Sequence, residues 1–256
     1  MSRLREAGAA ALVLAASALE ASAQIAEAPE PIAVDWPHEG LFGTFDRAAA
    51  QRGLQVYREV CSTCHSLTYV AFRNLMELGF GEDQVRALAA EYTVPGGPDD
   101  TGEIVERAAL PSDPIPPPYP NEQAARAANG GALPPDLSLI TKARAGGSDY
   151  VYSVLVGYEE PPANAAGGLE GTYYNAYFAG HWIAMPPPLQ EGLVQYADGT
   201  EATVPQMAAD VTTFLTWAGE PTLEQRKQTG LKAMLFLIVF TGLCYATMRK
   251  VWAYAH

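Results

Sequence analysis

Basic residues and cysteine are both scarce in this chain of 256 residues. Sixteen Lys and Arg stand against 29 Asp and Glu, which gives a formal net charge of −13. Because affinity for nucleic acid requires clustered Lys and Arg, this balance argues against a nucleic-acid-binding protein. Three cysteines are too few for a scaffold held together by disulfides. The length fits one domain of ordinary size with additions, or two small domains.

The N-terminal residues 1–23 have the pattern of a secretory signal peptide. Arg3 and Arg5 supply a positive start, residues 7–19 are apolar, and Ala-Ser-Ala at 21–23 forms a small-residue cleavage pattern. A short amphipathic helix of the mature protein is the alternative interpretation. We expect the signal peptide to be removed and the remainder of the chain to be exported.

A second apolar segment, residues 231–248, lies near the C-terminus and is interrupted only by Lys232. It is just long enough to cross a hydrocarbon core of about 30 Å, and Trp252 and Tyr254 follow where interfacial aromatics occur. A buried helix of a soluble protein is the alternative. Together with export, the segment predicts a single-pass protein of the bacterial inner membrane. Its parts are a periplasmic domain at 24–220, a C-terminal helix including the anchor at 221–252, and a cytoplasmic tail at 253–256.

Between the two ends, short helical segments alternate with long loops rich in Pro and Gly. Periodicity and capping residues predict helices over 46–60, 69–78, 83–92, 122–128, 149–156 and 207–218. We expect Asp46, Asn121 and Ser148 to cap three of them, and Pro221 to begin the final helix. The density of Pro and Gly predicts no regular element over residues 94–120. The expected fold is mainly α, and its long loops need something at the centre to organise them.

The chemistry of the chain is indicated by Cys-Ser-Thr-Cys-His at residues 61–65, a C-x-x-C-H sequence typical of covalent attachment of a c-type haem. Cys61 and Cys64 share one face of a helical turn, so both can bond to vinyl groups on one porphyrin edge. His65 follows directly and can reach the iron as the proximal ligand. A zinc site would need a second ligand pair, and a thioredoxin-like dithiol would need a βαβ context. The third cysteine, Cys244, lies in the C-terminal apolar segment as a small hydrophobe.

The sixth iron position has several candidate ligands. Met185 precedes three prolines in a stiff loop where no helical period explains a buried apolar residue. His181 lies close by in the sequence and keeps a bis-histidine centre open. The remaining candidates outside the signal peptide and the apolar segment are Met76, Met207 and His38. Both of these methionines fall at apolar-periodic helical places, where packing in the core is the better interpretation. We therefore predict His65 and Met185 as the axial pair, which raises the potential relative to two histidines.

Several further segments, in order, make the pattern more specific than the haem motif alone. They read CSTCHSLTYVAFRNL at 61–75, YPNEQAARAANGGALPPDLS at 119–138, ARAGGSDYV at 143–151, GYEEPP at 157–162 and MPPP at 185–188. With the single C-terminal anchor they extend over nearly the whole mature chain. On these residues the chain resembles the cytochrome c1 family, the haem subunits of quinol–cytochrome c oxidoreductase (cytochrome bc1) complexes.

The resemblance implies a mainly α c-type cytochrome domain with one covalently attached haem c. It implies that His65 and Met185 bind the iron, that Arg144 lies against a haem propionate, and that Tyr119 and Asn129 lie near the haem. Members of the family accept one electron from the Rieske iron–sulfur protein and donate it to a soluble cytochrome c. Cytochrome b holds their membrane anchor, and the subunit is not an enzyme on its own. The chain has no cysteine pair for the disulfide-bonded insertion that some bacterial relatives carry before the ligand methionine.

Two other functions stay open on the sequence. The chain is alternatively a membrane-anchored cytochrome that serves another dehydrogenase or oxidase, or a non-redox scaffold subunit, which would leave the C-x-x-C-H motif unused. The predicted exported part has 26 acidic and 9 basic residues, a field that attracts cationic partners. Candidate docking clusters are Glu82-Asp83, Asp99-Asp100 with Glu103 and Glu106, and Glu159-Glu160.

Overall fold

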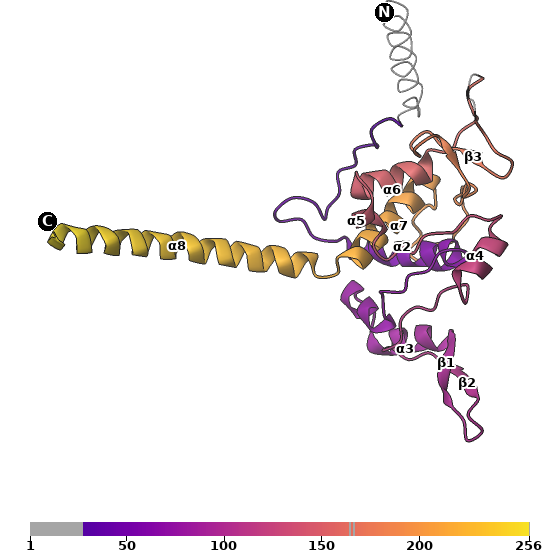
Figure 1. Ribbon diagram of the computed structural model, residues 1–256, viewed down its shortest axis with the longest axis horizontal. Coiled ribbons are helices and arrows are strands. Elements are labelled where there is room, and N and C mark those ends of the chain that lie inside the picture. Colours follow the sequence, from indigo (N-terminus) through magenta and orange to yellow (C-terminus); the bar gives the residue numbers. More distant parts are fainter. Residues whose placement is uncertain (1–27, 164, 166, 256) are drawn as a thin grey trace, which may run out of the picture.

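The computed structural model describes residues 28–163, 165 and 167–255, so the predicted signal peptide lies outside the described residues. The chain is mainly α: short helices joined by long loops form a body, and α8 extends from it as one long helix (Figure 1). The helices are α2 Arg47–Glu59, the 3₁₀ helices η1 Cys61–Thr63 and η2 Phe72–Leu78, α3 Glu82–Ala90, α4 Glu122–Ala128, α5 Ile140–Ala143, α6 Gly147–Val156, α7 Val204–Gly219 and α8 Leu223–Ala255. The strands are β1 Thr93–Pro98, β2 Ile104–Ala108, β3 Tyr173–Tyr174 and β4 Trp182–Ile183.

The core is centred where α2 and α7 pack against each other. Gly53 allows a close approach, because a Cβ there would lie 2.0 Å from the carbonyl oxygen of Asp210 and 2.7 Å from the Cβ of Phe214. Arg52 reaches across the same contact and donates two hydrogen bonds of 2.9 Å to the buried Asp210 carboxylate. Tyr57, near the end of α2, packs on Phe214 with ring centroids 5.8 Å apart. The contact therefore holds the end of α2 from which the C-x-x-C-H motif continues.

Two of the three predicted helix caps are confirmed. The Asp46 side chain accepts a hydrogen bond from Ala49 N at the start of α2. The Asn121 side chain accepts one from Ala124 N at the start of α4. Ser148 does not cap α6, which begins after Gly146 in the left-handed region with φ 83°. The Ser148 hydroxyl instead lies 2.9 Å from the Thr216 hydroxyl on α7. A glycine before the helix frees this serine for the buried α6–α7 contact.

The segment predicted as a helix over 69–78 is the shorter 3₁₀ helix η2, which ends as predicted at Gly79. Its buried residues, Phe72, Leu75 and Leu78, repeat every three residues, as the 3₁₀ geometry requires. Met76 falls off this face and is 45% exposed, so its predicted packing in the core is wrong. Met207 on α7 is fully buried, and the same prediction is confirmed for it.

The absence of regular structure predicted for residues 94–120 is also wrong, because β1 and β2 pair there as an antiparallel hairpin. β1 contains Pro95 and Pro98, and the register shifts between them. A two-stranded sheet has only edge strands, so each strand has one side without a hydrogen-bonded neighbour. A proline whose nitrogen lies on that side removes no hydrogen bond from the ladder. The hairpin projects from the body on a side different from α8 (Figure 1). Sequence reasoning also missed α5 and the short β3–β4 pair.

Helix α8 begins at Leu223, two residues after Pro221. Its Leu223–Tyr254 segment is long and apolar enough to cross a membrane, and none of its most apolar window is buried. Ion pairs hold its base to the body: Glu224 pairs with Arg47 at 2.6 Å. Just before the helix, Glu220 pairs with Lys142 at 2.6 Å. The apolar length of α8 is therefore left free of the body.

Candidate haem site

The C-x-x-C-H motif forms one tight turn directly after α2. The backbone N–H groups of Cys64 and His65 both donate to the carbonyl oxygen of Cys61, at 3.1 and 2.9 Å. The Ser62 hydroxyl donates to the carbonyl of Arg58 at 2.7 Å and closes the turn against the helix. Both cysteines are free and partly buried, and burial raises the pKa of Cys61 to about 12. The turn thus presents two thiols and an imidazole from adjacent positions, as thioether attachment beside an axial histidine requires.

His65 is oriented through its Nδ1 atom, which lies 2.8 Å from the carbonyl oxygen of Pro135. A carbonyl only accepts, so Nδ1 carries the proton and Nε2 is left with its lone pair. This is the arrangement in which a protein prepares an imidazole to bind a metal, and it raises the basicity of the ligand. Burial lowers the pKa of His65, against the opposing effect of the Pro135 bond, and so favours the neutral ring that a ligand needs.

Asp136 clamps the Pro135 segment onto the haem motif. Its carboxylate accepts hydrogen bonds from the Ser66 hydroxyl at 2.7 Å, from the N–H and hydroxyl of Thr68 at 3.0 and 2.8 Å, and from Ser138 N at 2.8 Å. Burial raises the pKa of Asp136, but the hydrogen bonds from Ser138, Thr68 and Ser66 outweigh it and lower the pKa to about 2. The carboxylate therefore stays charged and holds together two segments 70 residues apart.

The Met185 loop is held by a partly buried tyrosine. The hydroxyl of Tyr158 donates to the carbonyl oxygen of Met185 at 3.1 Å, and burial raises the pKa of Tyr158, which keeps this donor protonated. Tyr158 also bridges to Asn175, a fully buried residue whose amide donates to the carbonyl of Val154 at 2.8 Å. The loop before Met185 is thus held by an asparagine and a tyrosine in place of a disulfide.

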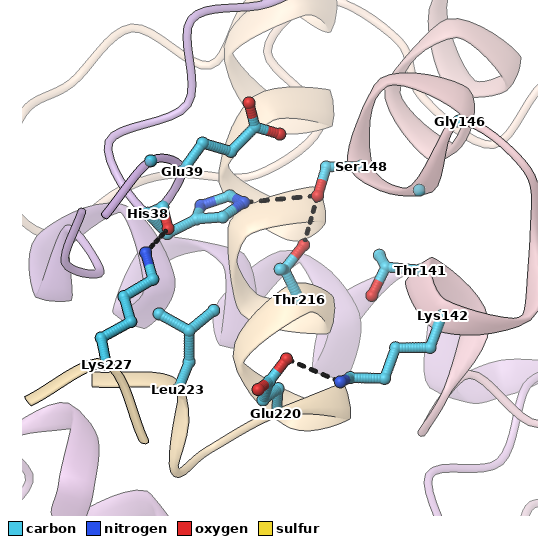
Figure 2. A pocket seen from close by; sticks show the side chains of 12 residues that line it. His38, Glu39, Thr141, Lys142, Gly146, Ser148, Thr216, Glu220, Leu223 and Lys227 are labelled. Carbon is cyan, nitrogen blue, oxygen red and sulfur yellow. Dashed lines mark hydrogen bonds and ion pairs between the residues drawn. The ribbon is translucent and has the colours of Figure 1, made fainter. Parts of the chain in front are cut away.

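The two competing histidines each pack against aromatic side chains. His38 is buried between Trp36 and Phe45, and its Nε2 lies 3.3 Å from the Ser148 hydroxyl (Figure 2). Burial, aided by Lys227, lowers the pKa of His38 to about 4. His181 has φ 63°, and its ring stacks on Tyr174 with centroids 5.4 Å apart. These contacts give each ring a packing role.

The three remaining predicted residues are Tyr119, Asn129 and Arg144, which flank Pro135 and Asp136 in the sequence. Asn129 donates from its side chain to the Tyr119 hydroxyl at 3.2 Å and to the Ala125 carbonyl at 2.7 Å, so the structure brings Asn129 and Tyr119 together. Arg144 is exposed at the end of α5 and donates to the carbonyl of Ala143. It has no ion pair within the described ranges, which leaves its charge available to an added carboxylate such as a propionate.

The sequence profile of the Cytochrome C1 family matches residues 36–255, which include every element named above. The chain belongs to the cytochrome c1 family. It is 50% identical over 233 residues to "Cytochrome c1" of Rhodospirillum rubrum, covering 85% of this chain and 86% of that protein. It is 52% identical over 223 residues to "Cytochrome b-c1 complex catalytic subunit, mitochondrial" of Candida albicans, covering 87% and 77%.

A third relative is longer than this chain. "Cytochrome b/c1" of Bradyrhizobium diazoefficiens is 50% identical over 271 residues, which cover 96% of this chain but only 39% of that protein. The family makes this chain a haem-carrying electron-transfer protein.

Among the residues that the structure describes, no group of three or more His, Cys, Asp or Glu is placed to hold a metal ion, so a zinc site at the motif gains no support.

Sequence reasoning missed the residues that orient the predicted cytochrome c1 ligands. Pro135 and Asp136 lie within residues 119–138, and Tyr158 lies within residues 157–162. The sequence assigns none of the three a role in positioning a ligand. One signal was available: an Asp followed two residues later by Ser138 is typical of a side chain that bonds its own backbone. Nothing local in the sequence indicates that Pro135 faces His65.

Proposed function

We propose that the chain carries one haem c bonded to Cys61 and Cys64, with His65 and Met185 as axial ligands, and passes single electrons. The 2.8 Å contact between His65 Nδ1 and the Pro135 oxygen carries this proposal, because it leaves Nε2 free beside two thiols. When bound, the haem supplies one-electron exchange between Fe(III) and Fe(II). The protein's own residues hold the two ligands: Pro135 and Asp136 orient His65, and Tyr158 holds the backbone of Met185.

Arg144 is proposed as the partner of a haem propionate, since a guanidinium pairs strongly with a carboxylate. Its exposure and lack of an acidic partner within the described ranges support this role. Tyr119 and Asn129 are proposed to lie near the haem, and their mutual hydrogen bond gives that part of the loop one fixed arrangement.

The proposed partners are those of a quinol–cytochrome c oxidoreductase. The Rieske iron–sulfur protein would supply the electron, a soluble cytochrome c would accept it, and cytochrome b would contact α8. The names of two relatives, "Cytochrome b/c1" and "Cytochrome b-c1 complex catalytic subunit", support this assembly. We propose the orientation predicted above, with residues 24–220 in the periplasm after removal of residues 1–23 and residues 253–256 in the cytoplasm.

Purification of the native assembly from membranes tests this function. We expect cytochrome b and an iron–sulfur protein to copurify with the chain, and quinol to reduce the bound haem. Copurification with a different dehydrogenase or oxidase would favour a membrane-anchored cytochrome that serves that enzyme. A chain that carries no haem stain after denaturing electrophoresis would favour the scaffold.

Electron transfer to a soluble cytochrome c is expected to slow at least tenfold between about 0.05 and 0.5 M salt, because screening shortens the reach of surface charge. Glu159 and Glu160 are exposed and directly follow Tyr158, which holds the Met185 loop. Stopped-flow rates should therefore fall several-fold when both are changed to glutamine. Glu82 and Asp83 are the matched control, because Arg86 already pairs with both. A rate independent of salt would remove the docking role.

A further inference from the structure

Two large apolar side chains are left in solvent where the body meets α8. Leu41 is 63% exposed and Phe42 is 76% exposed, in a loop that we name the junction loop, residues 38–44. In Figure 1 this loop projects from the body in the direction in which α8 runs. Adjacent exposed leucine and phenylalanine side chains forgo the free energy that burial would give them, so such a pair indicates an interaction surface.

The junction loop is built to hold this exposed pair in place. Glu39 N donates to the carbonyl of Trp36 at 3.0 Å, and Thr44 N donates to the carbonyl of Pro37 at 2.9 Å. Gly43 is required by the tightness of the turn, because a Cβ there would lie 1.8 Å from the carbonyl oxygen of Glu39. A loop closed by these bonds presents its two apolar side chains from a fixed position.

The loop is also tied to α8. The Lys227 ammonium donates to the carbonyls of His38 at 2.7 Å and Gly43 at 3.2 Å, and Phe45 N donates to Glu224 at 2.8 Å. Figure 2 shows Lys227 reaching the His38 carbonyl at the edge of a pocket of about 530 Å³. Lys227 also lines a second groove, of about 220 Å³, together with Leu41, Phe42 and Leu231, among others.

The groove shared with Leu231 indicates the depth of the loop. Leu231 begins the apolar run 231–248, which spans about 27 Å at 1.5 Å per residue and so nearly matches a hydrocarbon core of about 30 Å. Lys227 and Lys232 lie on either side of that point, at the level where lysines reach lipid headgroups. With α8 as the membrane anchor, the junction loop would therefore stand beside it at the boundary between headgroups and acyl chains.

We propose that Leu41 and Phe42 insert into the membrane interface beside α8 and give the body a second contact with lipid. Apolar side chains at such a boundary bury about 5–10 Å deep and bind in proportion to their area. One helix alone leaves the body free to rotate about its axis, whereas two contacts fix which face of the body points toward the membrane. This proposal depends on the membrane anchor and not on the haem.

The test uses the full haem-loaded chain, with any subunits that stay bound, reconstituted into phosphatidylcholine vesicles. A fluorescent nitrobenzoxadiazole label is placed at Leu41→Cys in a Cys244→Ala background. Leu169→Cys is the matched control, because Leu169 is a 74% exposed leucine before β3 that does not line the groove beside α8. An unchanged haem spectrum checks folding, and Phe42→Cys provides a second labelled position.

Lipid with a nitroxide near the acyl carbonyl is expected to quench the label at Leu41 at least twofold, while aqueous iodide quenches it little. The label at Leu169 should respond in the opposite way. The proposal is overturned if the Leu41 and Phe42 labels respond to iodide as Leu169 does, which would place the loop in water. It is equally overturned if neither quencher reaches them, because protein and not lipid would then cover the loop.

Discussion

Replacing Met185 with leucine is expected to abolish the weak red-edge sulfur-to-iron charge-transfer band of the oxidised protein. Leucine keeps the volume of the side chain but has no thioether, so the iron would lose a soft ligand that favours Fe(II). Axial ligands cover a range of about 0.8 V, and a fall in potential on the order of 0.1 V or more is expected from this loss. Absorption spectra of the oxidised form and a redox titration measure the two effects.

Two other methionines give matched controls for this substitution. Met207→Leu changes a fully buried side chain of α7, and Met76→Leu changes an exposed one on η2. Both should keep the band and the potential. His181→Gln separates the bis-histidine alternative, because it should leave the band in place if Met185 is the ligand. A Met185→Leu protein that keeps a low-spin haem of unchanged potential would refute the assignment.

Replacing Asp136 with alanine is expected to destabilise the body by about 2–4 kcal/mol and to lower the reduction potential as well. The change removes a charged acceptor of four hydrogen bonds, and bonds to charged groups contribute about 1.5–3 kcal/mol each before relaxation. It also loosens Pro135, whose carbonyl orients His65. Denaturant unfolding and a redox titration of the same samples report the two losses separately.

The pH dependence of this effect has a definite sign. The folded pKa of Asp136, about 2, lies below the ordinary 3.8, so its stabilisation is present above pH 3.8 and is lost as pH falls toward 2. Asp113→Ala is the control, because Asp113 also has a pKa lowered to about 2 by Arg107 but lies beside the β1–β2 hairpin. Asp113→Ala should change stability without moving the potential. If Asp136→Ala also leaves the potential unmoved, Asp136 has no part in orienting His65.

The features predictable from the sequence are those that local chemistry determines. Asp46 and Asn121 cap helices because a side chain three residues before a free N–H needs no distant partner. The C-x-x-C-H turn and the apolar run of α8 are equally local. Met76 was misjudged because a 3.6-residue period was applied to a segment that winds as a 3₁₀ helix.

The features that could not be predicted depend on contacts between distant segments. His65 and Pro135 are 70 residues apart, and nothing near either one indicates that they meet. Tyr158 and Met185 are 27 residues apart, with β3 and β4 between them. The β1–β2 hairpin was hidden for a different reason, since its prolines argue against a strand except at an edge.

Every electron-transfer role proposed for this chain requires one haem bonded through thioethers to Cys61 and Cys64. Intact-mass spectrometry of the chain purified from membranes, followed by peptide mapping of residues 59–73, tests it most directly. We expect a single species heavier than the polypeptide by one haem, with the added mass on the peptide that contains both cysteines. A chain of unmodified mass whose two thiols react freely with an alkylating reagent would contradict it.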